Sequence, residues 1–165
     1  DQPIWKRFFM IAPLALVGTR EEDGYDLAPK HMLTPMGFDN YFGFVCTPTH
    51  GTYQNIEKYG EFTVSFPLPD QTLMTSLSAN HRDEGVSKSK QIIDYLPTCR
   101  AREVDGLFLE QSYLMLEFRH FKTIDGFGRN SLITGTILHA HVHPDYLRVS
   151  EADEQQLLHE HPLLA

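Results

Sequence analysis

The sequence contains few cysteines and few basic residues. Its 165 residues include only Cys46 and Cys99, which form no Cys-x-x-Cys pair, so a disulfide-stapled miniprotein is excluded and no disulfide is indicated. Lysine and arginine total 14 against 22 aspartate and glutamate residues, which gives a formal net charge of −8. Because an acidic chain repels a phosphate backbone, we expect no nucleic-acid partner, whereas a single phosphate in a local pocket is compatible with this charge.

The sequence also lacks a long apolar run. Residues 8–17 are apolar and follow Lys6 and Arg7, as in a secretory signal, but the run is shorter than the roughly 18–20 residues that span a bilayer. Pro13 interrupts the run, and no small-residue cleavage site precedes the charged residues 20–23. We therefore expect a cytoplasmic protein with no membrane partner.

Several catalytic motifs are missing as well. The chain has no Gly-x-Gly-x-x-Gly, no Gly-x-x-x-x-Gly-Lys-Ser/Thr, no His-Glu-x-x-His and no Gly-x-Ser-x-Gly. These absences leave dinucleotide folds, P-loop enzymes, zinc proteases and α/β-hydrolases without support. No residue stands out as a general acid or base, so the sequence does not identify the catalytic residues.

Turn-forming residues are frequent, with 11 glycines and 10 prolines, and hydrophobic residues make up 41% of the chain. This pattern predicts a single, mainly β domain over residues 1–165, with about six strands closing into a barrel and a few short helices. Turns are expected at residues 22–24 and 125–126, and Pro29 confines its strand to a sheet edge or a bulge. The expected strands are residues 14–19, 25–34, 41–46, 61–66, 113–121 and 131–142.

Helical patterns are short. Residues 53–59 predict a helix that ends at Gly60, and residues 70–79 predict a second one with Asp70 as its N-cap. Residues 80–106 read as a helical and loop excursion, with a helical piece at 92–96 and a solvated basic cluster at 88–90. Residues 150–165 are expected to form a C-terminal appendage with a helix at 153–159.

The first candidate site is the strand, loop and helix of residues 44–56. Gly51 allows a tight loop, Thr52 and Asn55 lie in the first turns of the helix, and His50 can become cationic. Free N–H groups at a helix N-terminus together with such side chains suit a single phosphate. On composition alone, an ordinary capped helix is the favoured interpretation, because these residue types cap most helices without binding anything.

The second candidate is the trio His139, His141 and His143, which share one face of the expected strand. Neighbouring histidines of the trio can reach one metal ion, but the first and third lie about 13 Å apart at the rise of a strand. Residues 135–143 match the opening of the cupin metal motif, yet the glutamate expected after it is missing. A solvated strand face is therefore the favoured interpretation, and no metal site is predicted.

Three segments resemble the flavin reductase-like FMN-binding split-barrel family, particularly its flavoredoxin-like branch. They read PLALVGTREEDGYDLAP, YFGFVCTPTHGTYQNIEKYGEFTVSFP and NSLITGTILHAHV. The likeness spans about residues 12–143, and its most specific part runs from Gly43 to Phe62, where strand, loop, helix and strand follow the order and spacing of the family.

This resemblance implies a six-stranded antiparallel Greek-key split barrel that binds FMN non-covalently, usually at a homodimer interface. The flavin would lie against residues 28–32 and its phosphate against the loop and helix that follow the strand at 41–46. With this resemblance, the capped-helix interpretation gives way to a phosphate site. The cofactor-binding residues predicted in this way are Ala28, Pro29, Lys30, His31, Met32, Cys46, Thr47, Pro48, His50, Gly51, Thr52 and Asn55.

The activity implied by the resemblance is hydride transfer from NADH or NADPH to the flavin, followed by electron transfer to free flavin, oxygen or a redox protein. Two alternatives remain: a flavoredoxin-like electron carrier without NAD(P)H activity, and a metal-dependent β-barrel using His139, His141 and His143.

The chain also departs from the family. Asp26 stands where many relatives carry asparagine, so its charge must be compensated or face solvent. Residues 30–32 replace the small residues common there.

Overall fold

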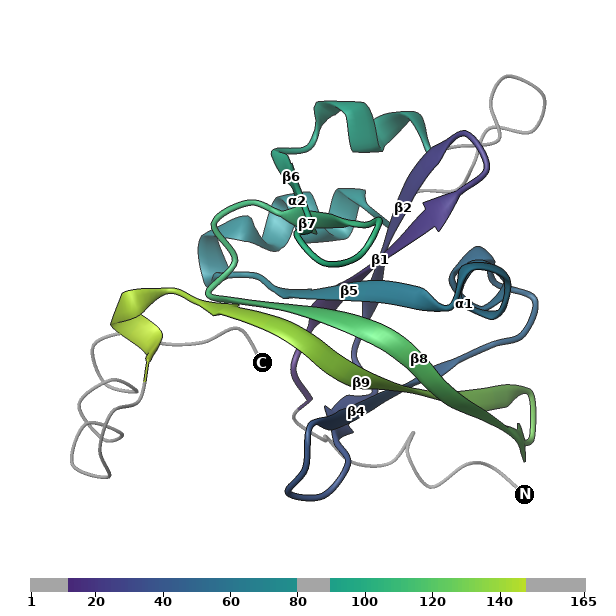
Figure 1. Ribbon diagram of the computed structural model, residues 1–165. Helices are drawn as coiled ribbons and strands as arrows, with labels where there is room; N and C mark the ends of the chain where they lie inside the picture. The colour runs from purple at the N-terminus through teal and green to yellow at the C-terminus, as the bar shows by residue number, and fades with distance from the viewer. Residues whose placement is uncertain (1–11, 80–89, 148–165) are drawn as a thin grey trace, which may run out of the picture.

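The computed structural model describes residues 12–79 and 90–147 (Figure 1). Seven strands form one curled antiparallel sheet in the order β2-β1-β5-β8-β9-β4-β3. This confirms the predicted mainly β split barrel, with one strand more in the sheet than the six that were predicted. The strands are β1 (Ala15–Glu21), β2 (Gly24–Lys30), β3 (Leu33–Pro35), β4 (Tyr41–Cys46), β5 (Glu61–Phe66), β8 (Leu114–Phe127) and β9 (Asn130–Val142).

Several of the remaining elements pack against β1, β2 and β5. In Figure 1, α1 (Gly51–Tyr59) lies at one end of β5. The short helix α2 (Thr72–Leu77) lies close to a two-stranded sheet made of β6 (Thr98–Arg100) and β7 (Leu107–Leu109). Three 3₁₀ turns complete the described residues: η2 (Pro69–Gln71), η3 (Gln91–Tyr95) and η4 (Pro144–Tyr146). None of the helices in these residues is long and apolar enough to cross a membrane.

An aromatic cluster forms the core of the curled sheet. The rings of Phe62 and Phe118 stack with their centroids 4.7 Å apart, and Phe44 meets Phe62 edge to face. Gly135 on β9 faces this cluster so closely that a Cβ there would lie 2.6 Å from the ring of Phe62. The curl of the sheet therefore depends on a residue without a side chain at this position.

A buried carboxylate ties the loop before β7 to the sheet. Glu117 on β8 is 2% exposed. Its two oxygens accept hydrogen bonds from the backbone N–H groups of Arg102, Glu103 and Val104, at 2.6 to 3.1 Å. Successive N–H groups that converge in this way form a concave anion site, which here is filled by the protein's own carboxylate.

Several elements match their predicted bounds. Strands β4 and β5 coincide with residues 41–46 and 61–66, and β9 begins one residue before the predicted strand. Gly60 ends α1 in the left-handed conformation with φ of 74°, as predicted, and its N–H donates to the carbonyl oxygen of Ile56. The helix begins at Gly51, two residues earlier than predicted, and β1 extends to Glu21.

The predicted strand at residues 25–34 is wrong as a single element. The chain bends at His31 and Met32, so its two halves become β2 and β3, which lie at opposite ends of the sheet. β2 pairs with β1, whereas β3 pairs with β4. The placement of Pro29 on a sheet edge is confirmed, because β2 is an end strand of the seven-stranded sheet and the ring nitrogen of proline has no hydrogen to donate.

The turn predicted at residues 125–126 is also wrong. β8 continues through Gly126 to Phe127, and the hairpin turns at Gly128 and Arg129 instead. Three irregularities in the β8–β9 register absorb the extra length, one of them between Ile124 and Phe127. β8 is therefore longer than the predicted strand at 113–121, and the hairpin carries an extended arm.

The helix predicted at residues 70–79 is shorter and has a different start. Pro69 opens a 3₁₀ turn, and the side chain of Gln71 accepts a hydrogen bond from the N–H of Leu68, so Asp70 is not the N-cap. Residues 92–96 do contain a helical turn, η3, but the excursion also contributes β6, and β7 was not predicted. The helix predicted at residues 153–159 lies outside the described residues.

Candidate functional site

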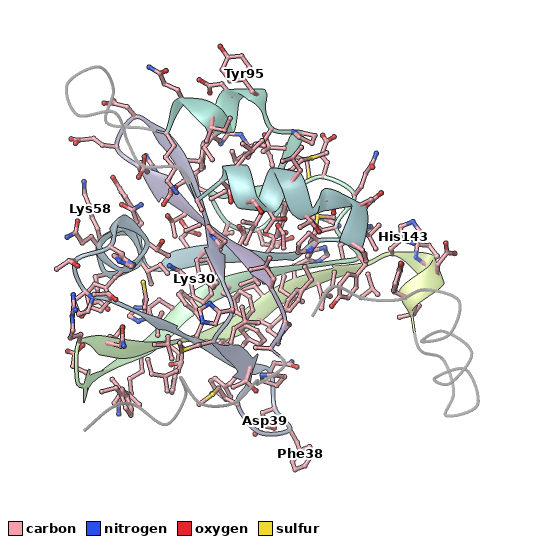
Figure 2. The ribbon with its side chains drawn as sticks, turned by 180° about the vertical axis from the view of Figure 1, so that it is seen from behind. Lys30, Phe38, Asp39, Lys58, Tyr95 and His143 are labelled. Atoms are coloured by element: carbon pink, nitrogen blue, oxygen red, sulfur yellow. The ribbon has the colours of Figure 1, made fainter. Side chains whose placement is uncertain are left out.

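The two segments predicted to bind the flavin lie next to each other. The backbone N–H of Val45 donates to the carbonyl oxygen of Met32 at 2.9 Å, which joins the end of the β2–β3 bend to β4. Lys30, the last residue of β2, faces both the thiol of Cys46 and the imidazole of His50. Figure 2 labels Lys30 near the middle of the molecule and Lys58 on the outer side of α1. The fold thus unites residues that are about twenty positions apart in the sequence.

The groups around Lys30 differ in charge. Burial raises the pKa of the Cys46 thiol, and Lys30 opposes this effect only in part, so the thiol is protonated near neutral pH. Burial, followed by the repulsion from Lys30, lowers the pKa of His50, which favours the neutral imidazole. The ammonium of Lys30 is therefore the main positive charge of this cluster in the free protein.

The start of α1 adds backbone donors to the same place. His50 is the N-cap in an extended conformation, and no side chain caps the first turn, which also contains no acidic residue. The N–H groups of a first helical turn lack partners within the helix and carry partial positive charge. Together with Lys30 they form an arrangement that suits a phosphate monoester.

Three predicted phosphate ligands face the protein instead. The hydroxyl of Thr47 donates to Oδ1 of Asn130 at 2.9 Å, and Nδ2 of Asn55 donates to Oγ1 of Thr19 at 3.0 Å. Thr52 is only 2% exposed. These side chains hold the loop and α1 against β1 and β9, so the donors left for a phosphate are backbone N–H groups, Lys30 and His50.

Hydrogen bonds also attach α1 to the β8–β9 arm. The hydroxyl of Thr123 donates to Oε1 of Glu57 at 2.5 Å, and the hydroxyl of Tyr53 donates to Oδ1 of Asp125 at 3.3 Å. The same Thr123 hydroxyl lies 2.9 Å from Nε2 of His120. The position of the helix N-terminus is therefore set by β8 as well as by β1.

The predicted flavin segment is exposed at its end. Ala28 is 7% exposed and Pro29 is half-buried, whereas His31 and Met32 reach solvent, with Met32 49% exposed. Pro48 in the opposite loop is exposed as well. Backbone groups and an apolar Met32 side chain of this kind can contact an aromatic ring system. In a single copy of the chain these residues form an open surface.

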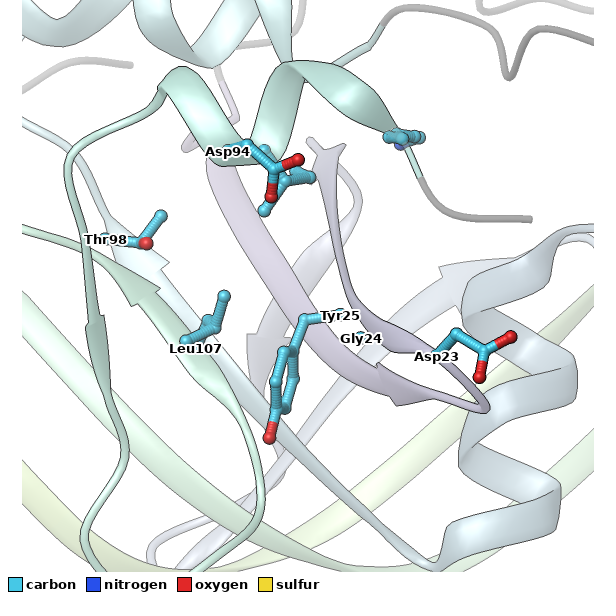
Figure 3. Close-up of a pocket in the computed structure, with 8 residues that line it drawn as sticks. Asp23, Gly24, Tyr25, Asp94, Thr98 and Leu107 are labelled. Atoms are coloured by element: carbon cyan, nitrogen blue, oxygen red, sulfur yellow. The ribbon is translucent and has the colours of Figure 1, made fainter. Parts of the chain in front are cut away.

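A cavity of about 330 Å³ lies elsewhere, between the β1–β2 hairpin and the η3, β6 and β7 elements (Figure 3). None of the predicted cofactor-binding residues lines it. Its lining residues are Asp23, Gly24, Tyr25, Lys90, Ile93, Asp94, Thr98 and Leu107.

The sequence requires the charge of Asp26 to be either compensated or exposed to solvent, and the structure shows that it is compensated. The residue is 3% exposed, and its carboxylate lies 2.8 Å from the ammonium of Lys90, so the charge is compensated inside the protein. The prediction of a solvated basic cluster at 88–90 is wrong for Lys90, whose side chain is only 11% exposed. The sequence drew attention to Asp26 because many relatives carry asparagine there. No neighbouring residue in the sequence indicated that Lys90 is its partner.

His139 and His141 of β9 and His143 just after it do not gather around one point. Among the described residues, no three histidine, cysteine, aspartate or glutamate side chains are close enough to hold a metal ion. His139 is half-buried opposite Glu117, His141 is exposed opposite Met115, and Nδ1 of His143 accepts from the N–H of Asp145. This geometry offers no support for the metal-dependent alternative.

Comparison with known proteins identifies the family of the chain and supports the fold. The flavin reductase like domain family matches residues 7–160, so the chain belongs to this family. A flavoredoxin from Methanosarcina acetivorans superimposes with a TM-score of 0.73 at 21% identity, over 90% of this chain and 78% of that one. An FMN-binding protein from Thermus thermophilus, solved with 1-cyclohex-2-enone, gives 0.74 at 21% identity, over 90% and 79% of the two chains.

A third solved relative is an NADH:FAD oxidoreductase from Streptomyces globisporus. It superimposes with a TM-score of 0.71 at 15% identity, over 81% of this chain and 76% of that one. No curated protein sequence gives a significant match. The described fold is thus that of the flavin reductase split barrels, and the family supports a flavoprotein with oxidoreductase activity in general terms.

Proposed function

We propose that this protein is an FMN-binding oxidoreductase that takes hydride from NADH or NADPH and passes electrons to free flavin, oxygen or a redox protein. The observation that carries the proposal is that Lys30 lies near His50, the N-cap of α1, in a chain of the flavin reductase family. The first turn of α1 has no side-chain cap, so its N–H groups are available to a ligand. A dianionic phosphate requires this combination of a cation and converging N–H donors.

The residues fit the parts of FMN in a simple division. Lys30, His50 and the N–H groups at Gly51 and Thr52 would hold the phosphate, while the backbone from Ala28 to Met32 would face the ring. Bound FMN would supply the acceptance of hydride and the transfer of electrons, and the protein would supply position and electrostatics. Lys30 keeps a positive charge at the phosphate end, and the buried Cys46 thiol stays neutral beside it.

We propose a second copy of the chain as the partner that completes this surface. Met32 at the bend is 49% exposed, and Met36 and Phe38 in the loop between β3 and β4 are 36% and 110% exposed. Apolar side chains that gather beside an open site favour burial against another protein surface. The homodimer, the redox protein acceptor and the cytoplasmic location remain predictions from the sequence.

The test is an absorption titration of the purified protein with FMN, followed anaerobically by NADH and then NADPH. Binding followed by rapid bleaching is the expected result for a reductase. Binding without bleaching would favour the electron carrier instead, and a protein that leaves the FMN spectrum unchanged would refute the flavin site.

The phosphate assignment is tested with Lys30→Met and with riboflavin, which lacks the phosphate. We expect Lys30→Met to weaken FMN by roughly 1.5–3 kcal/mol, the usual value of a hydrogen bond to a charged group, and to leave riboflavin affinity nearly unchanged. Lys58→Met is the matched control, because Lys58 is an exposed lysine on the outer side of α1 (Figure 2). An equal loss for FMN and riboflavin would contradict the assignment.

A further inference from the structure

A buried ion pair lies next to the predicted flavin segment without belonging to it. Oδ1 of Asp26 on β2 lies 2.8 Å from Nζ of Lys90, and the two side chains are 4% and 11% exposed. Asp26 comes two residues before Ala28, where the predicted ring contacts begin. A buried pair of this kind costs desolvation energy that an apolar pair would not, so its presence is not explained by stability alone.

Lys90 does more than neutralise the carboxylate. Its ammonium also donates to the carbonyl oxygens of Leu27 at 3.2 Å and of Ser78 at 2.9 Å, so its three N–H donors have three acceptors. The contacts connect β2, the end of α2 and the residue before η3. A single side chain thereby fixes three segments relative to one another.

β2 depends on such an external contact. It is an end strand that pairs with β1 alone within the described sheet, and Pro29 has no N–H to contribute. The carbonyl of Leu27, which Lys90 holds, is adjacent to Ala28. Anchoring this carbonyl and the Asp26 carboxylate fixes the backbone from which residues 28–32 extend.

We propose that Lys90 is a positioning residue for the flavin: it holds β2 in the conformation that the ring requires and keeps the charge of Asp26 balanced. This inference rests on the proposed function, because it concerns the same binding segment. It predicts two separate effects of losing the ammonium. The binding segment becomes less ordered, which weakens FMN, and an uncompensated carboxylate near the flavin opposes the gain of negative charge on reduction.

The experiment compares Lys90→Met, Lys90→Arg and the double variant Asp26→Asn/Lys90→Met. For each, thermal stability, the dissociation constant of FMN and the midpoint potential of bound FMN are measured. We expect Lys90→Met to weaken FMN about tenfold or more, since tenfold corresponds to only about 1.4 kcal/mol of lost preorganisation, and to make the potential more negative. Lys90→Arg should retain affinity within roughly threefold because it keeps charge and donors.

The double variant separates the two effects and remains informative if Lys90→Met fails to fold. It removes both charges, so the potential should return toward that of the unmodified protein, while FMN stays weakly bound because the contacts to Leu27 and Ser78 are lost. Glu117→Gln is the matched control. It replaces a buried carboxylate outside the proposed site with a neutral amide, so it should lower stability without moving the potential.

A Lys90→Met protein that loses stability like the control but keeps the affinity and potential of the unmodified protein would overturn the positioning role. If that variant does not fold, a double variant with unchanged affinity would overturn it equally. Failure of the unmodified protein to bind FMN would refute the proposed function itself, and the positioning role with it.

Discussion

The carboxylate of Glu117 provides a sharp test of how the loop before β7 is held. Replacing it with glutamine keeps the size of the side chain and one acceptor oxygen but removes the charge. The three N–H donors of residues 102–104 would then face a neutral amide, whose NH₂ group cannot accept from them. We expect the loop to lose most of its attachment to β8, while the core around Phe62 stays intact.

The magnitude follows from the three donors. A hydrogen bond to a charged group contributes about 1.5–3 kcal/mol and a neutral one about 0.5–1.5 kcal/mol. Arg102 and Glu103 are exposed and their N–H groups can turn to water, whereas Val104 is 7% exposed and its N–H cannot readily do so. We therefore expect Glu117→Gln to lower the free energy of unfolding by about 2–3 kcal/mol, and Glu117→Ala by about 3–5 kcal/mol.

Urea unfolding followed by circular dichroism measures this difference, and the melting temperature should fall by roughly 5–10 °C for Glu117→Gln. Glu103→Gln is the control, because that side chain is half-exposed and its ion pair with Arg102 is on the surface; the change should stay within about 0.5 kcal/mol. A Glu117→Gln protein as stable as this control would refute the reasoning.

Three further changes test other parts of the molecule. Gly135→Ala places a methyl group 2.6 Å from Phe62, so we expect a loss of more than about 2 kcal/mol in urea unfolding; a loss under 0.5 kcal/mol would show that the sheet relaxes freely. Asn55→Ala removes the hydrogen bond to Thr19 and should cost about 1 kcal/mol of stability, with FMN affinity changing by less than for Lys30→Met. His50 has a lowered pKa in the free protein, and a bound phosphate would raise that pKa, so FMN binding takes up a proton. The affinity of the unmodified protein for FMN, relative to that of His50→Gln, should therefore increase as the pH falls through the range in which His50 gains its proton. A ratio of the two dissociation constants that does not change with pH would exclude the contact.

The sequence predicted the strands that are bounded by clear punctuation. Residues 61–66 lie between Gly60 and Pro67 and alternate in polarity, so both ends of β5 could be located from local signals. Residues 25–34 carry no comparable break at His31 and Met32. The chain bends there because β2 pairs with β1 whereas β3 pairs with β4. That choice depends on partners elsewhere in the chain.

The site shows the same division. Residue types near 46–55 indicated N–H donors at the start of a helix, but on their own they favoured an ordinary capped helix. The phosphate site was predicted only from the family resemblance, and it stays a prediction. The direction of the Asn55 amide toward Thr19 could not be predicted, because it depends on the packing of α1 against β1. Lys90 was missed for a similar reason: its partner Asp26 lies on a distant strand, and the surrounding sequence is polar.

The order of the strands has a consequence for how the chain folds. β2 and β3 are joined by only two residues, yet they lie at the two ends of the seven-stranded sheet. The β1–β2, β3–β4 and β8–β9 hairpins close through local contacts, whereas β1 must find β5 and β4 must find β9 across long stretches of chain. Since the β3–β4 hairpin joins the sheet only when β4 pairs with β9, the bend at His31 and Met32 reaches its final geometry late. A ligand that binds this bend would therefore slow unfolding far more than it accelerates folding.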